Sequence, residues 1–173
     1  MLKIADGIDG AIDKICQAVL LITGTILMGA LTANVLARYV LATGGFDWAE
    51  EIPEQMFPWF IMAGVALAVQ HLGHVAVEWL LGMVNSATAR IVLLGGHALV
   101  IAAYVVLVVQ SLTVADIVSI ERSPALGLPK TYGYWAIAAG SALVALSTVA
   151  GTLRLYVLGL EGYFRPHKPE ATA

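Results

Sequence analysis

Charged residues are scarce in this sequence. Asp, Glu, Lys and Arg make up 12% of its 173 residues, whereas hydrophobic residues make up 60%. A typical soluble domain is about a quarter charged. Cys16 is the only cysteine, which excludes an internal disulfide and a thiolate-rich metal centre. These scarcities argue against an ordinary soluble domain and indicate an integral membrane protein.

Long stretches without a charged residue divide the chain. A membrane-spanning helix needs about 20 such residues, and the stretches lack the alternation with period two that is typical of strands. In lipid, every backbone amide must also be satisfied within the chain. The sequence therefore predicts an all-α integral membrane bundle of four transmembrane helices, at about residues 15–40, 50–70, 90–115 and 131–156.

The segment between the second and third predicted spans has a different pattern. Residues 74–86 are too apolar for a solvated loop and too short for a span. One helical face can carry the large apolar residues Val77, Leu80, Leu81 and Val84. We expect an amphipathic interfacial helix here. With a polar tail over residues 163–173, the chain is predicted to be a single membrane domain.

Basic residues near the helix ends predict the orientation, because cytoplasmic loops carry more of them. With four alternating spans, six lysines and arginines fall on one side of the membrane and three on the other. Both termini are therefore expected in the cytoplasm, with the chain in a bacterial inner membrane. A cleavable signal peptide has an apolar region of about 7–15 residues. The first apolar run is longer, so we expect it to be retained as a helix.

Four carboxylates gather where the second span begins, in the stretch FDWAEEIPEQMFPWF. Asp47 and Glu50 match a capping box, in which Asp47 caps the helix and Glu50 reaches back to its amide. Carboxylates also suit the positive end of a helix dipole. Glu51 and Glu54 are less well explained by capping. A polar contact with a partner subunit is the alternative for these two.

Prolines and aromatic residues shape the ends of the predicted spans. Pro58 lies inside the second span and should bend it, since proline removes a backbone hydrogen bond. Pro129 belongs to a constrained turn between the third and fourth spans. Trp48 and Tyr132 suit an interfacial aromatic belt.

Histidines offer a candidate cofactor site. His71 and His74 could pair with His97 to ligate haem or a metal, which gives the alternative function of a haem-binding membrane anchor of a redox enzyme. A Soret band from the purified protein would identify bound haem. His97 is equally explained by a neutral imidazole bonded to a neighbouring helix. Other polar groups inside the spans, such as Asn34 and Gln110, are sparse, so no catalytic residue is predicted.

Four motifs, taken in order, resemble a known family. They are NVLARYV at 34–40, WAEE at 48–51, GVALAVQHLGHVAVEWL at 64–80 and LGLPKTYGYWAI at 126–137. With them, the sequence resembles the small membrane subunit, of DctQ type, of tripartite ATP-independent periplasmic (TRAP) transporters. The resemblance covers roughly residues 26–155 and implies a non-catalytic scaffold in a sodium-driven importer of an organic acid.

The resemblance also implies partners. A larger membrane subunit would hold the substrate and sodium sites, and a periplasmic binding protein would deliver the substrate transiently. The lipid bilayer is the remaining expected partner, with no nucleic acid, cofactor or metal. A stand-alone small exporter is a third hypothesis, but the sequence shows neither the inverted repeats nor the broken helices typical of self-contained transporters.

Individual positions carry the family pattern. They are Arg38, Trp48, Glu50, Glu51, His74, Glu78, Pro129 and Tyr132. The resemblance assigns them to a partner interface or to structural motifs, and each also has a structural explanation, such as snorkelling for Arg38. Glu54, with its neighbouring prolines, departs from the family's usual unbroken hydrophobic helix. We expect Glu51 and Glu54 to face a basic patch on the large subunit or on the binding protein.

Overall fold

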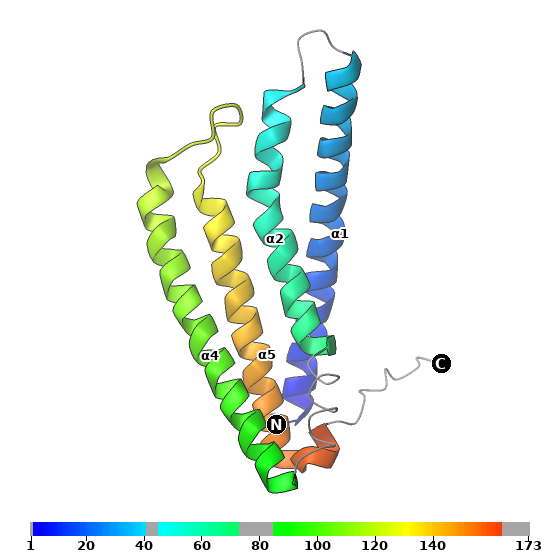
Figure 1. Cartoon of the computed structure of the whole chain (residues 1–173), viewed down its shortest axis with the longest axis vertical. Helices are drawn as coiled ribbons and strands as arrows, with labels where there is room; N and C mark the ends of the chain where they lie inside the picture. The colour runs from blue at the N-terminus through cyan, green and yellow to red at the C-terminus, as the bar shows by residue number, and fades with distance from the viewer. Residues whose placement is uncertain (1, 41–44, 73–84, 164–173) are drawn as a thin grey trace, which may run out of the picture.

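The computed structural model describes residues 2–40, 45–72 and 85–163 and is all-α in these residues (Figure 1). The long helices are α1 (Leu2–Val40), α2 (Asp47–Leu72), α4 (Ser86–Ile117) and α5 (Thr131–Tyr163), and a short 3-10 helix, η1 (Val118–Ile120), follows α4. Four helices are long and apolar enough to cross a membrane, over Gly10–Val40, Asp47–Gln70, Thr88–Ile120 and Thr131–Val157. The prediction of an all-α fold with four spanning helices is confirmed.

Two helices extend beyond the predicted spans. Helix α1 begins at Leu2 rather than near residue 15, and Ile12, before the predicted span, is buried against the neighbouring helices. Helix α5 continues past residue 156 and contains a kink at Gly159, where φ is 68° and ψ is −172°. Only glycine adopts such a conformation readily. Residues 73–84, which hold most of the predicted interfacial helix, and the tail from residue 164 lie outside the described residues.

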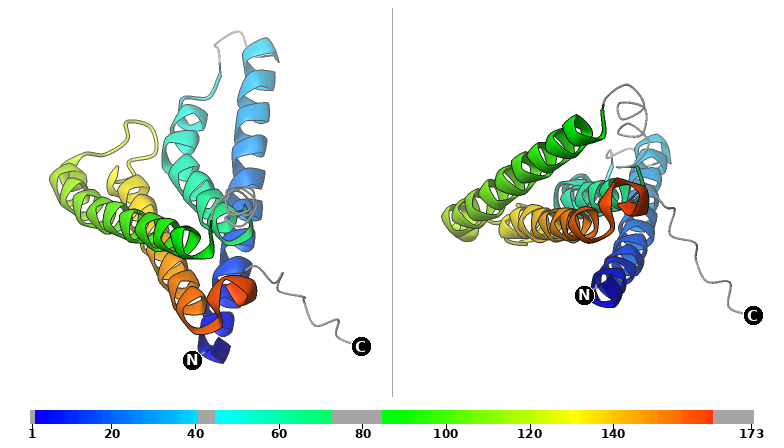
Figure 2. Two further views of the ribbon diagram at one scale, coloured as in Figure 1. Left: turned by 60° about the horizontal axis from the view of Figure 1, so that its bottom comes forward. Right: turned by 90° about the horizontal axis from the view of Figure 1, so that it is seen from below.

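The helices lie in a row in the order α4, α5, α2, α1 (Figures 1 and 2). The most extensive contacts join α4 to α5, α1 to α2, and α2 to α5, while α1 touches α5 only lightly. Helices α2 and α5 start at the end of the molecule where α1 and α4 finish, which is the top of Figure 1. We call this the upper end and the opposite one the lower end.

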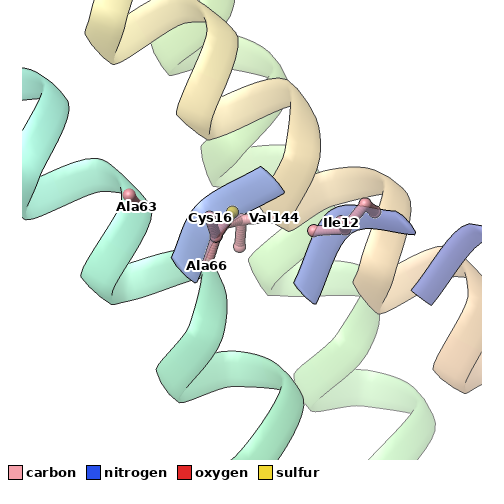
Figure 3. Packing of buried hydrophobic residues seen from close by; sticks show 5 residues of the cluster. All are labelled: Ile12, Cys16, Ala63, Ala66 and Val144. Carbon is pink, nitrogen blue, oxygen red and sulfur yellow. The ribbon is translucent and has the colours of Figure 1, made fainter. Parts of the chain in front are cut away.

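Small side chains fill the centre of the row. The buried cluster consists of Ile12 and Cys16 of α1, Ala63 and Ala66 of α2, and Val144 of α5 (Figure 3). Small residues let helix backbones approach closely in a membrane. Large apolar side chains such as Leu21 and Met28, both 72% exposed, point outward instead. The helices therefore pack mainly through small side chains, with a few buried large ones such as Leu93 and Leu155, and present many bulky residues to the surroundings.

Helix α2 runs as one helix through Pro53 and Pro58. Pro58 lies against α5, since a Cβ atom added to Gly133 would come within 3.3 Å of its Cγ. Pro58 thus belongs to the α2–α5 contact and does not end the helix.

Candidate functional site at the upper end

Residues 121–130, which we call the upper loop, connect η1 to α5 and hold their own shape. The Ser123 N–H donates to the Leu128 carbonyl at 2.9 Å. The Ser123 hydroxyl oxygen accepts the Leu128 N–H at 3.2 Å. Between them, Gly127 has a φ of 65°, in the left-handed region that favours glycine. These contacts close the loop into a tight hairpin.

The carboxylate of Glu51, in the first turns of α2, binds the tip of the upper loop. Its Oε1 accepts the Ala125 N–H at 2.7 Å, and its Oε2 accepts the Leu126 N–H at 2.8 Å. Only 9% of Glu51 is exposed. Consecutive amide N–H groups aimed at one anion form a nest. Glu51 therefore ties the start of α2 to the segment before α5.

A second polar contact joins α1 to α2. The Arg38 guanidinium forms an ion pair with Glu50 Oε1. Both side chains are exposed, at 58% and 62%, and exposed ion pairs contribute only about 0–1 kcal/mol. Asp47 is itself the first residue of α2, so the structure does not show the predicted capping box. Glu50 instead pairs with the arginine that the end of α1 brings alongside it.

Asn34 of α1 accepts a hydrogen bond from the backbone just before α2. Its Oδ1 accepts the Phe46 N–H at 2.8 Å, and its side chain is buried. This bond satisfies an amide just before the start of α2, where amides have no partner within the helix. A Cβ atom at Gly45 would collide with the same oxygen. The sequence signal for this role is a carboxamide near the end of a span, followed by glycines before the next helix.

Lys130 stands between two carboxylates. Its Nζ lies 3.9 Å from Glu54 Oε1 and 3.6 Å from Glu121 Oε2. The Glu54 side chain remains 53% exposed. Of the two acids for which a partner contact is predicted, Glu51 is enclosed by the upper loop and Glu54 is accessible.

Aromatic rings flank these contacts. Trp48 stacks on Phe46 with ring centroids 5.3 Å apart, and Tyr132 meets Trp135 edge to face at 5.9 Å. Trp48 and Tyr132 are each 40% exposed at the starts of their helices, where an interfacial belt would lie. Pro129 forms an isolated β-bridge across the upper loop.

Polar side chains also link α5 to its neighbours between the two ends. The Thr152 hydroxyl donates to the Thr148 carbonyl at 2.8 Å, and its oxygen lies 3.0 Å from His97 Nδ1. This contact joins His97 of α4 to α5. His97 is thus bonded to a neighbouring helix, as one of its two interpretations expected. Gln70 of α2 similarly donates to the Ser147 hydroxyl at 3.1 Å.

Two predicted site residues, His74 and Glu78, lie outside the described residues, as does the side chain of His71. Among the side chains that the structure describes, no three His, Cys, Asp or Glu residues gather closely enough to hold a metal ion. The polar contacts at the upper end instead join Arg38 to Glu50 and Glu51 to the upper loop. This arrangement fastens helices to one another.

Comparison with known proteins gives the family. Residues 27–157 match the model of a family described as tripartite ATP-independent periplasmic transporters, DctQ component. The match includes the contacts of the upper end. A curated relative, uncharacterized protein y4mM of Sinorhizobium fredii (strain NBRC 101917 / NGR234), is 42% identical over 149 residues, which are 86% of this chain and 28% of that protein. The chain thus matches just over a quarter of this relative's length.

No solved structure matches the chain. The family match, however, extends over most of the sequence, from the middle of α1 to residue 157 in α5. The chain therefore belongs to the DctQ family, the small membrane subunits of tripartite ATP-independent periplasmic transporters.

Proposed function

We propose that this chain is the non-catalytic scaffold subunit of a sodium-driven transporter that imports an organic acid. In this proposal a large membrane subunit holds the substrate and sodium sites, and a periplasmic binding protein delivers the substrate. The chain lies in a bacterial inner membrane with both termini in the cytoplasm. The observation that carries the proposal is the family match over residues 27–157.

The contacts between helices support a scaffold role. Arg38 and Glu50 join α1 to α2, Glu51 joins α2 to the upper loop, and His97 with Thr152 joins α4 to α5. Each of these polar groups is engaged in holding the chain's own elements together. A scaffold needs such internal fastening, whereas a transport site needs polar groups that are free to bind a solute.

The exposed apolar surface supports a partner within the membrane. Residues such as Leu99, 72% exposed, and Val106, 57% exposed, face away from the chain along α4. Lipid covers such surface, and so does a larger membrane subunit. At the upper end, which this proposal assigns to the periplasmic side, the Glu54 side chain is 53% exposed and open to contact by a partner.

The proposal is tested in cells that depend on this transporter. Deletion of the chain, with the large subunit and binding protein still expressed, should abolish uptake of a radiolabelled organic acid, and a plasmid copy should restore it. Replacing external sodium with potassium should abolish uptake in the intact strain. The large subunit should co-purify with the tagged chain in mild detergent.

Uptake that persists in the deletion strain would contradict the scaffold role. Uptake that persists without sodium would contradict sodium as the driving ion and leave the scaffold role intact. The level of the large subunit in the membrane, measured by immunoblot in each strain, separates loss of function from loss of the partner protein.

A further inference from the structure

Gln110 of α4 has an unusual environment for a carboxamide. It lies within the span Thr88–Ile120, ten residues before the end of that span, and its side chain is exposed. At a rise of about 1.5 Å per residue this is roughly 15 Å from the upper end of the span. Within the described part of the chain, the Gln110 side chain makes no hydrogen bond.

The direction of α4 favours a lean of this amide away from the upper end of the span. Side chains on an α-helix lean toward its N-terminus, and α4 begins at the lower end (Figure 1). We therefore expect the Gln110 side chain to lean toward the middle of the span rather than toward its upper end. Acyl chains offer no hydrogen bonds, so a carboxamide facing lipid at this depth is unfavourable.

Gln110 belongs to a continuous exposed stripe of α4. The stripe has helical spacing and consists of Leu99, Ala103, Val106, Gln110, Thr113 and Ile117. The side of α4 that packs on α5 is a different one, marked by His97 and the buried Ser111 and Ala115. The stripe is thus the side of α4 left open at the edge of the row (Figure 2).

Several other exposed polar side chains in the spans find a partner within the chain itself. Gln17 of α1 donates to Asp13 one turn away, at 2.8 Å. The Thr25 and Thr113 hydroxyls donate to carbonyls of their own helices, at 2.7 Å and 2.9 Å. Gln110 differs from these because its partner has to come from outside the described chain.

We infer that a spanning helix of the large subunit packs along this stripe and pairs an uncharged amide or hydroxyl side chain with the Gln110 carboxamide. Lipid does not supply such a group, and a charged partner at this depth would be more costly than a neutral one. The inference rests on the proposed function, because it takes the large subunit as the occupant. It adds which face of the chain that subunit covers and the chemistry it presents there.

The test compares two identical substitutions in the detergent-purified complex. Gln110→Leu should weaken binding of the large subunit by about three- to thirty-fold, the range expected for an interhelical hydrogen bond in a membrane. Gln17→Leu is the matched control, since its hydrogen bond lies within α1, and binding should stay within twofold of the unchanged chain. Equal binding by both variants, or an equal loss in both, would overturn the inference.

A second measurement does not depend on how a variant folds. A photo-crosslinking residue at position 110 of the assembled complex should form an adduct with the large subunit. An adduct between two copies of this chain, or no protein adduct, would overturn the inference while leaving the proposed function intact. If the unchanged chain does not co-purify with the large subunit at all, both the proposed function and this inference fail.

Discussion

The acidic residues at the start of α2 differ in the groups that they bind. Glu50 and Glu54 face cations, and their side chains are more than half exposed, so water competes with each ion pair. Glu51 accepts hydrogen bonds from two consecutive backbone amides and is nearly buried. Backbone donors are fixed by the fold and lose little conformational freedom on binding. Glu51 is therefore the acid on which the position of the upper loop depends.

Replacing Glu51 tests this assignment. In Glu51→Gln, one of the two oxygens becomes an NH2 group, which would face a backbone N–H and leave that amide without an acceptor. We expect the midpoint of thermal unfolding in detergent, followed by circular dichroism, to fall by at least roughly 2–4 °C. Glu54→Gln removes an exposed carboxylate and should change the midpoint much less. Equal midpoints for the two variants would contradict the role of Glu51.

The sequence does not distinguish these acids, because their partners are remote along the chain. Glu51 accepts hydrogen bonds from Ala125 and Leu126, which are separated from it by 74 and 75 positions in the sequence. Glu50 pairs with Arg38, at a separation of 12 positions. A capping box involves only residues that are close in the sequence, so it was the explanation that local sequence could offer for Asp47 and Glu50. The anchoring of the Phe46 amide by Asn34 was missed for the same reason. The local sequence pattern located the acidic cluster at the start of α2. The tertiary contacts determine which group each acid binds.

At the scale of helices, the contact between α2 and α5 depends on a missing side chain. A Cβ atom at Gly140 would come within 2.5 Å of Met62 Cβ and 2.9 Å of its Cε. The methionine tip can move, but its Cβ is fixed to the backbone of α2. The two helices can therefore lie this close only with glycine at position 140.

Gly140→Ala should force α2 and α5 apart. We expect overpacking to cost about 1–3 kcal/mol, measured as the free energy of unfolding in mixed detergent micelles. Gly64→Ala is the matched control, because a Cβ there meets only Leu20 Cδ2 at an ordinary 3.9 Å. That variant should change stability by less than about 1 kcal/mol. A Gly140→Ala protein as stable as the control would show that this interface relaxes easily.

Sequence patterns predicted where the helices lie in the chain better than they predicted which helices pack against each other. Continuous apolar runs located all four spans, since length and hydropathy decide what can cross a membrane. Small residues let helices pack closely, but the sequence does not specify which helix each of them meets. Ala136 and Gly140 lie buried in the row, whereas Ala98 and Ala102 are exposed on α4. Which small residues meet another helix depends on the order of the row, which no local pattern specifies.

At the scale of the whole molecule, a row of helices leaves both edge helices open along one side. Helices α1 and α4 occupy the edges (Figure 2), and exposed residues such as Leu21, Met28 and Leu99 line them. A row has more surface for its volume than a closed four-helix bundle has. This shape suits the proposed role of a subunit that is joined to a larger membrane protein and to lipid.

The same row makes the membrane topology testable. Gly45 precedes α2, which begins at the upper end, and Asn85 precedes α4, which begins at the lower end (Figure 1). The excess of basic residues predicts that the lower end is cytoplasmic. Alkaline phosphatase, which is active only in the periplasm, should therefore be active when fused after Gly45 and inactive when fused after Asn85. Green fluorescent protein at the same positions, which fluoresces in the cytoplasm, should give the opposite pattern.

Reversed activities would invert the orientation but preserve the fold, because the two junctions would still lie on opposite sides. Equal activity at both junctions would contradict the fold itself, since α2 would then not cross the membrane.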